Sequence, residues 1–586
     1  MRLVLAIVSF FLAAVMISFG IAQRTILEGA DHVTASVTTS SPATVTVIDG
    51  AVLNSFDHSQ TIKASGAKTI FAAYGRTDDV IAWVGDAGYN KIGYDAQAQK
   101  LTTTSVPGTE TEVPDPAGSD LWLADYTEDR SLGFTINVPD DVSVLIVSDG
   151  AKPAPSALSV TWLLDNSTPW AVPLVIGGSM LLLLGLIFLL WAINHMRRAR
   201  GPRRKQLRMP KVPRPPAYKP VKRGAPAPKA VTRGRRSAGM IAVIPALLVG
   251  ALALGGCTAD PTMSLENGTA IDVAATSAPT NASGDPLDAP AVTEPQAKRI
   301  VSRVSVAVTD ADASSDATKI ATRLDGPALA LRLANYKIRT VDTTTAPLAA
   351  IPSSPVALVL PQQNNSWPRT FFVVIQPVDV TVAPTALMLI QDDPRSQYKV
   401  HYALQLEPGT VVPKVAKASV GASRFDEDSK FPLLPPSQIA EAYGDILHVD
   451  KASKWYDYFQ AEGDTLRVEV GPAEQAADQA KLPGTAQLAF SNKPADAQIV
   501  ALATNNSGAI VALSLDELQT ISPVESGVAV NAPPAIAALL GKTLSTRGIT
   551  ATYGDQLLFY VPPATNKDGK IILLGYTQGP ISAAEL

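Results

Sequence analysis

A run of 23 residues without a charged side chain, from Ala171 to Ile193, constrains this chain more than any other stretch. A helix needs about 20 apolar residues to cross the hydrocarbon core of a bilayer. Trp170 and Trp191 stand near the two ends of the run, where amphipathic rings favour the membrane interface. The sequence therefore predicts a transmembrane helix over 170–194. The 586 residues that it divides are too many for one core.

A second apolar run, from Leu3 to Ala22, is also long enough to span a bilayer. Its last residues, Gly20-Ile21-Ala22, resemble the small-residue cleavage site of a signal peptide, but the run is longer than the usual apolar core of such a peptide. We expect an uncleaved transmembrane anchor over 1–23, with a cleaved signal as the alternative. The composition agrees with a membrane protein, because 46% of the residues are apolar and only 17% are charged.

A basic block predicts the orientation of these spans. Residues 197–236 contain sixteen Lys or Arg, eight Pro and no Asp or Glu. Because short loops rich in Lys and Arg stay in the cytoplasm, we expect a basic, Pro-rich cytoplasmic linker over 195–237. Residues 25–169 are then exported. The block acts as a topological stop, or alternatively docks on anionic lipid or an acidic partner. Both exported parts are mildly acidic, so nucleic acid is not an expected partner.

The only cysteine of the chain, Cys257, ends a third apolar run over 238–256. Leu254, Gly255, Gly256 and Cys257 have the form of a bacterial lipobox, and basic residues precede the run. Small residues before the cysteine let a signal peptidase reach the bond, and the thiol can then carry a diacylglyceryl group. We predict lipidation at Cys257. A buried free cysteine at the end of a membrane helix is the alternative.

Residues 257–296 are rich in Thr, Ala, Pro, Asp and Ser and predict a flexible tether after the lipid anchor. Cleavage before Cys257 would give two products, a two-span protein and a separate lipoprotein. Two adjacent genes joined into one reading frame are a further alternative, with Met209 or Met240 near the second start.

The first exported part, 25–169, is expected to be an all-β, sandwich-like domain. Short runs rich in Val, Ile, Thr and aromatic residues alternate with turn signals such as Asp49-Gly50. Trp83 and Trp122 are expected in the core. The strands are predicted at 43–48, 69–73, 80–84, 133–138 and 142–147.

The second exported part is expected to be α+β, built from two modules over 297–430 and 431–586. Each begins with helical periodicity and continues with strand patterns, as in NTF2-like or cystatin-like folds. Asp316 is predicted to cap a helix, and Gly326-Pro327 to begin another. Further helices are predicted from Ser437 and over 534–540, with strands at 369–376, 385–391, 397–407, 464–470, 485–490, 497–503, 508–513, 549–552, 556–561 and 570–576.

A family resemblance covers roughly 296–585. Gly326-Pro327-Ala328-Leu329 followed by Arg332, Ala334 and Tyr336, and Tyr553-x-x-Gln556 leading to Val561-Pro562, resemble a domain of unknown function in lipoproteins of high-GC Gram-positive (actinobacterial) bacteria. The first 200 residues are similar to actinobacterial membrane proteins with a stretch like Ser148 to Pro155 before a span. The resemblance implies a cell-envelope location and supplies no activity.

No catalytic motif, cofactor site or metal site is expected. The five histidines, His32, His58, His195, His401 and His448, lack metal-ligand spacing, and no Walker loop or nucleophile elbow occurs. Asp310, Asp312 and Asp316 resemble the start of a calcium loop, but positions six and twelve are Ser315 and Ala321 where that loop needs Gly and Glu. They are interpreted as helix-cap and loop residues.

The chain is thus expected to be a multi-pass protein of the cell membrane with both large domains outside. We expect a non-enzymatic binding or scaffolding role, with membrane lipids, other envelope proteins or cell-wall glycans as partners. The alternative is an accessory or enzyme that acts on lipid-linked glycans or cell-wall precursors.

Overall fold

The computed structural model describes all residues except 28, 165–167, 200–270, 273–286 and 380. They form two compact units. The first comprises Met1–Asp31 and the described residues between Asp165 and Thr269, and the second comprises His32–Leu164 and Ala270–Leu586.

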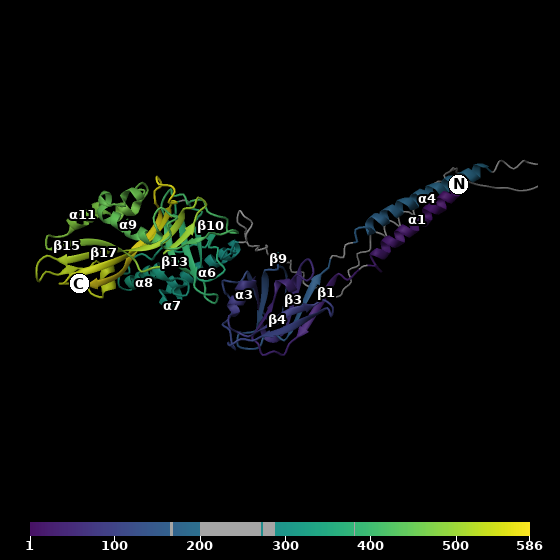
Figure 1. The fold of residues 1–586 in the computed structure, drawn as a ribbon, viewed down its shortest axis with the longest axis horizontal. Helices are drawn as coiled ribbons and strands as arrows, with labels where there is room; N and C mark the ends of the chain where they lie inside the picture. Colours follow the sequence, from purple (N-terminus) through teal and green to yellow (C-terminus); the bar gives the residue numbers. More distant parts are fainter. Residues whose placement is uncertain (28, 165–167, 200–270, 273–286, 380) are drawn as a thin grey trace, which may run out of the picture. The chain divides into compact units, whose positions relative to one another are not determined.

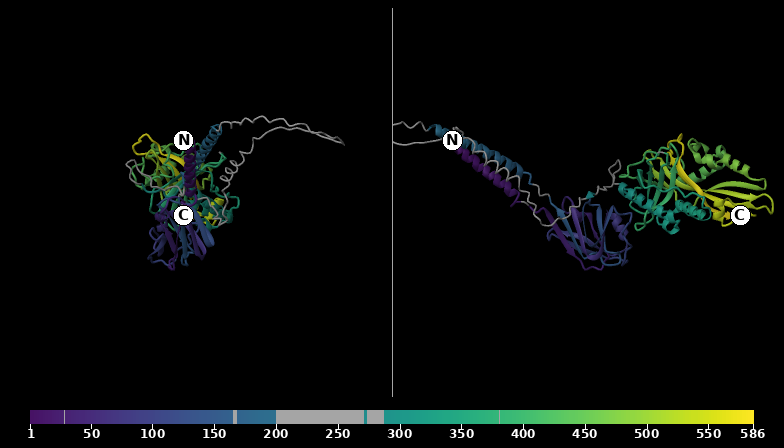
Figure 2. Two further views of the ribbon diagram at one scale, coloured as in Figure 1. Left: turned by 90° about the vertical axis from the view of Figure 1, so that its right-hand side faces the viewer. Right: turned by 180° about the vertical axis from the view of Figure 1, so that it is seen from behind.

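The first unit is an antiparallel pair of apolar helices, α1 (Arg2–Gln23) and α4 (Ala171–Ala199), which lie side by side in Figures 1 and 2. Glycines on α4 allow the close approach, since a Cβ at Gly178 would lie 2.7 Å from Ile17 Cγ1. Large side chains such as Phe11 and Ile187 are exposed on the outside of the pair. Both helices are long and apolar enough to cross a membrane, as predicted for 1–23 and 170–194. The third predicted span, 238–256, lies outside the described residues.

The N-terminal part of the second unit is β-rich, with nine strands in one sheet. Its strand order is β1-β8-β3-β7-β2-β4-β5, and β6 pairs with β3 and with β9. The strands are β1 (His32–Thr38), β2 (Val45–Ile48), β3 (Gln60–Arg76), β4 (Tyr89–Asp95), β5 (Lys100–Val106), β6 (Ala124–Asn137), β7 (Val142–Val147), β8 (Ala157–Leu163) and β9 (Ile271–Asp272), with helices α2 (Gly50–Leu53) and α3 (Thr77–Val84).

The long strand β3 organises this sheet. Its first half pairs with β8 and its second half with β7, and its pairing with β6 is interrupted between Ser65 and Thr69. Gly66 at the interruption has φ +97°, which favours glycine. Side chains inside the bent sheet, such as Ile62 and Trp162, form one core. On the other face, Trp83 of α3 packs with the buried Trp122 in a second core, as expected from the sequence.

The prediction of a strand at 80–84 is wrong, because these residues belong to helix α3. Val80, Trp83 and Val84 are buried at helical spacing against the sheet. Asp78 and Asp79 lie in the first turn, where the helix dipole favours carboxylates. A short apolar run does not distinguish a strand from a buried helix, and here packing decided.

The C-terminal part is α+β, with a sheet of ten strands in the order β10-β11-β12-β13-β21-β20-β17-β16-β14 and β15 beside β17. The helices are α6 (Glu294–Ser314), α7 (Ala317–Ile320), α8 (Gly326–Val341), α9 (Pro436–Val449), α10 (Thr465–Val470), α11 (Pro472–Lys481) and α12 (Pro534–Leu540), with short 3₁₀ turns at Asp450–Ala452 and Tyr456–Tyr458. The strands are β10 (Val356–Pro361), β11 (Arg369–Ile375), β12 (Thr385–Gln391), β13 (Lys399–Leu406), β14 (Arg424–Phe425), β15 (Ala486–Pro494), β16 (Val500–Ala503), β17 (Ala509–Pro523), β20 (Ile549–Val561) and β21 (Ile572–Glu585), and β18 (Val530–Asn531) pairs with β19 (Leu544–Ser545).

The two predicted modules share this sheet. Strands β13 and β21 pair through Gln405 with Tyr576 and Leu406 with Gly575. Helices α6 and α8 contribute to a core over the first half, and α9 contributes to another over the second half. A further core contains residues of both halves, such as Phe372 and Leu558. The halves are therefore packed together rather than independent.

Several predicted helix boundaries are confirmed. The Asp316 side chain accepts hydrogen bonds from the backbone of Thr318 and Lys319 at the start of α7. Helix α8 begins at Gly326 with Pro327 in its first turn, and α12 spans the predicted 534–540. These ends depend on capping by residues within one helical turn, so they can be recognised from the sequence alone.

Other predictions for this part are wrong. Residues 464–470, predicted as a strand, form α10, and the Asp464 side chain accepts a hydrogen bond from the Arg467 N–H at its start. The strands predicted at 549–552 and 556–561 are one strand, β20, because β17 and β21 pair along both sides of it. Strand β13 also contains a bulge at His401, where its register with β12 shifts, so Val400 and Tyr402 face different cores.

Candidate functional site

The edge strand of the ten-stranded sheet forms one wall of a candidate binding site. Among the described strands, β10 pairs with β11 and with no other. Ala357 near its start is exposed, whereas Val359 is buried, so the strand passes from the surface into the core. An edge strand presents unpaired backbone groups on its open side and has to be covered or left for a ligand.

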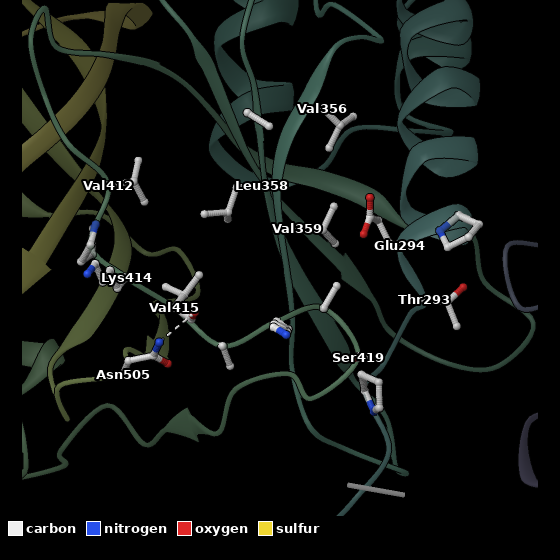
Figure 3. Close-up of a pocket in the computed structure, with 17 residues that line it drawn as sticks. Thr293, Glu294, Val356, Leu358, Val359, Val412, Lys414, Val415, Ser419 and Asn505 are labelled. Atoms are coloured by element: carbon white, nitrogen blue, oxygen red, sulfur yellow. Dashed lines mark hydrogen bonds between the residues drawn. The ribbon is translucent and has the colours of Figure 1, made fainter. Parts of the chain in front are cut away.

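The opposite wall is the segment 411–419, which has no regular secondary structure. Asn505 holds this segment in place. The Asn505 backbone N–H donates to the Lys414 carbonyl at 3.0 Å, and the Asn505 side-chain Nδ2 donates to the Val415 carbonyl at 3.0 Å (Figure 3). At its end, Gln363 Nε2 donates to the Val420 carbonyl at 2.9 Å. The loop is thus fixed at both ends, which keeps a space open between it and β10.

We call this space the edge groove. Its volume is about 870 Å³, which is in the usual range for small-molecule sites. Figure 3 shows Leu358 and Val359 of β10 across from Val412 and Val415. The groove is lined by Pro290, Thr293, Glu294, Pro295, Val356–Val359, Val412–Ser419 and Asn505.

The lining of the edge groove is mostly apolar and carries three charged side chains. Glu294 is paired with Lys298 at 2.7 Å. Lys414 and Lys417 are exposed, and in the described part of the chain neither ammonium forms an ion pair. A smaller hollow of about 400 Å³ shares Pro413, Lys414 and Asn505 with the groove. The site can therefore hold an elongated apolar group. The positive charge lies on the protein, at the rim of the groove.

The start of α6 closes one end of the groove. Thr293 and Gln296 form a capping box, in which the Thr293 N–H donates to Gln296 Oε1 at 3.0 Å. The Gln296 amide also donates from Nε2 to the Leu121 carbonyl of the β-rich part at 2.9 Å. The same cap therefore supports the groove and a contact between the two parts of the second unit.

Residues 288–585 match a family described as a domain of unknown function, DUF8094. This range covers just over half of the 586 residues. The chain belongs to the DUF8094 family. No curated protein and no solved structure matches the chain. The range agrees with the resemblance expected over 296–585, and the link to actinobacterial lipoproteins stays a prediction.

The residues that carry the resemblance described from the sequence, such as Gly326 and Tyr336, make structural contacts outside the edge groove. Gly326 has φ +48° and lies against the His401 ring, which leaves no room for a Cβ. Asp312 accepts hydrogen bonds from Arg332 and from the Tyr336 hydroxyl, the latter at 2.5 Å. Burial and this carboxylate raise the pKa of the Tyr336 hydroxyl.

Gln556 links the two halves of the DUF8094 sheet. Its Oε1 accepts the Ala403 N–H at 2.9 Å, so β20 of the second half contacts β13 of the first. Its neighbour Asp555 is fully buried on β20, and neither carboxyl oxygen has a hydrogen-bond partner among the described residues. Burial, followed by the charge of Glu517, raises the pKa of Asp555 well above its usual value. Burial also raises the pKa of Glu517.

Of the residues predicted as functional from the sequence, those that the structure describes do not line the edge groove. Cys257 and the lipobox residues Leu254, Gly255 and Gly256 lie outside the described residues. Asp310 and Asp312 belong to α6 rather than to a loop, and Asp316 caps α7. No group of His, Cys, Asp or Glu in the described ranges has the arrangement of a metal site.

Sequence reasoning missed the edge groove because its walls come from four distant segments. One local signal was available. Segment 411–419 contains Val, Pro, Lys and Ala without a helix or strand period, which is typical of a loop that covers apolar surface.

Proposed function

We propose that this protein is a membrane-anchored, non-enzymatic binding protein of the cell envelope, and that the edge groove of its DUF8094 domain holds the apolar chain of an amphiphile. The observation that carries the proposal is the groove itself, about 870 Å³ in volume and lined mainly by aliphatic side chains. Burial of an acyl chain there is favourable by about 0.8 kcal/mol for each methylene group.

The charged rim supports an anionic head group. Lys414 and Lys417 are exposed beside the apolar lining, so a phosphate or carboxylate can lie near both ammonium groups while the chain enters the groove. Glu294, the one carboxylate of the lining, is paired with Lys298. This arrangement favours a binding role. An accessory protein or an enzyme that acts on lipid-linked glycans is the second candidate function, since a ligand of this kind would suit it as well.

The helix pair supports the membrane anchor. The apolar side chains on the outside of α1 and α4 suit contact with lipid, and Arg197 and Arg198 in the last turn of α4 continue into the basic block. We propose that residues 197–236 are cytoplasmic and that both large domains are outside. The lipid on Cys257 is the proposed second anchor, and membrane lipids, envelope proteins or cell-wall glycans are the proposed partners.

At the level of fold, we propose a sandwich-like β-rich domain and two NTF2-like or cystatin-like halves in the DUF8094 domain. The enclosed core around Trp162 supports the first. The second is supported by the order of elements, because α8 and α9 each precede antiparallel strands that end at the shared pair β13 and β21.

The ligand can be tested on the full chain purified in mild detergent. Native mass spectrometry of the wild type should show a co-purified anionic amphiphile, and binding of a fluorescent fatty acid should be measurable. Ala357→Trp places a large ring in the groove and should reduce fatty-acid binding by about tenfold or more, which corresponds to the loss of about two methylene contacts. Val378→Trp, at an 86% exposed residue, is the matched control.

Charge is tested separately. Lys414→Glu combined with Lys417→Glu should weaken binding of an anionic amphiphile and leave a neutral one unchanged, whereas Lys430→Glu with Lys567→Glu changes the same charge elsewhere. Equal binding by the Ala357→Trp protein and the wild type would refute the groove as the ligand site. Turnover of a lipid-linked glycan by the wild type would favour the enzymatic alternative.

A further inference from the structure

A row of side chains on α6 faces the β-rich part of the second unit. Gln296, Arg299 and Arg303 are spaced by three and four residues, so they share one face of the helix, next to the face of the buried Ile300 and Val304. Arg299 donates from Nη1 to the Leu123 carbonyl at 3.0 Å, and Arg303 donates from Nη1 to the Gly118 carbonyl at 2.9 Å. The irregular segment 118–123 therefore presents its carbonyl groups to this helix face.

Asp120 lies at the centre of the segment and is fully buried. Its carboxylate lies 2.5 Å from Arg323 Nη1 and 3.3 Å from Arg303 Nη1, and it accepts the Tyr398 N–H at 3.0 Å. All three donors belong to the DUF8094 domain. A carboxylate that is removed from water needs such partners, because an unpaired buried charge is strongly unfavourable.

Asp79 makes a second buried contact. Arg76 of the same domain binds both of its oxygens, at 2.8 and 3.0 Å, and Arg369 of the DUF8094 domain places Nη1 2.8 Å from Oδ1. Arg369 is fully buried, and its guanidinium lies 3.8 Å from the centre of the Trp367 ring. Arg76 in turn donates to the Pro290 carbonyl at 3.2 Å.

Arg395 makes a third contact, at the C-terminal end of α3. It donates to the carbonyls of Trp83 and Val84 at 2.9 and 2.8 Å and pairs with Glu110 at 2.7 Å. Carbonyls in the last turn of a helix have no partner within the helix, and a cation there is favourable. The DUF8094 domain thus supplies arginines at three places where the β-rich domain supplies carboxylates and backbone carbonyls.

We propose that the β-rich domain, 32–164, is a docking partner for the DUF8094 domain in its own right, so that the two remain bound after the chain between them is cut. Cleavage before Cys257 would then produce a complex of two chains rather than two independent proteins. The buried charges favour this partner, because Asp79 lies against Arg369 and Asp120 lies against Arg303 and Arg323. The proposal does not depend on the ligand of the edge groove.

The test uses the full chain in detergent, with an affinity tag at the N-terminus and a site-specific protease sequence inserted between Ser277 and Ala278, so that β9 stays with the N-terminal fragment. After cutting, the wild-type C-terminal fragment should stay on the affinity resin through extensive washing at physiological salt. Its release from the resin after cutting would overturn the proposal.

Variants then locate the surface. Arg299→Glu combined with Arg395→Glu should increase release of the fragment by at least about tenfold, since charge reversal at an interface typically costs several kcal/mol. Lys298→Glu, next to Arg299 but exposed, should retain the fragment as the wild type does. From the other side, Asp79→Lys should release it and the exposed Asp78→Lys should not.

Thermal unfolding of the uncut variants separates release from misfolding, because a variant that only loses docking keeps the unfolding transitions of both domains. If both interface variants fold and retain the fragment as firmly as their controls, the proposed surface is wrong.

Discussion

Asp120 and Arg323, 203 residues apart in the sequence, form a buried ion pair of 2.5 Å between the β-rich domain and the DUF8094 domain. The carboxylate is fully buried and the Arg323 side chain is 11% exposed, so neither charge is compensated by water as it would be at the surface. The pair makes the packing of the two domains sensitive to single substitutions.

Asp120→Ala should destabilise the packed domains by about 3 to 5 kcal/mol, because Arg303 and Arg323 lose their carboxylate while they stay partly buried. Differential scanning calorimetry of the full chain measures this loss. Asp78→Ala removes an exposed carboxylate of the same domain and should stay within about 0.5 kcal/mol of the wild type. Similar values for the two variants would contradict the role given to Asp120.

The part of the DUF8094 domain's stability that Asp555 and Glu517 contribute should fall as the pH rises above about 4, the ordinary pKa range of a carboxyl group in an unfolded chain. Asp555 and Glu517 have raised pKa values in the folded state because they are buried, so the folded protein binds more protons than the unfolded chain in this window. The resulting stabilisation is largest at low pH and is lost as the pH rises through the folded-state pKa values.

Asp555→Asn should remove part of this slope. Urea denaturation between pH 4.5 and 8 measures it, and each unit of pKa difference corresponds to about 1.4 kcal/mol. Asp568→Asn, at an exposed residue, is the control and should keep the wild-type slope. A slope that is unchanged in Asp555→Asn would show that Asp555 does not titrate in this window.

Gly326→Ala should destabilise the DUF8094 domain by about 1 to 3 kcal/mol, the usual cost of a strained backbone conformation. Its φ is +48°, and a Cβ would lie 2.3 Å from His401 Cε1. Gly484→Ala has no atom within 4 Å of the new Cβ and serves as the control. Chemical denaturation of both proteins tests this, and equal midpoints would contradict the steric argument.

Cys257→Ser should abolish incorporation of radiolabelled fatty acid, because the chain contains one cysteine. With tags at both ends, a blot of the wild type should show two tagged fragments, and a blot of the variant should show one full-length product. Ser36→Ala, an unrelated change in β1, controls for expression. A single full-length product in both proteins would argue against cleavage before Cys257.

Local features of the sequence determined several elements. Asp316, Gly326-Pro327 and the run over 534–540 predicted helix ends correctly, because caps and prolines act within one helical turn. Likewise, the apolar runs near Leu3 and Ala171 predicted the two long apolar helices, since length and hydropathy suffice for that inference.

Other features needed tertiary structure. Residues 80–84 and 464–470 look like strands by composition, but packing against a sheet and an Asp cap make them helices. The edge groove requires β10, segment 411–419, Asn505 and the start of α6 to meet in space. The face of Gln296, Arg299 and Arg303 is visible as helical spacing, yet its partner carbonyls at 118–123 are not.

The sequence by itself determined which residues are apolar, charged or able to cap a helix, and it located the spans, the basic block and the single cysteine. The tertiary structure decided which of the charged residues are buried in pairs and which apolar residues line a groove. The physical reason is that burial and ion pairing depend on contacts between distant segments, whereas helix caps and membrane spans depend on neighbouring residues.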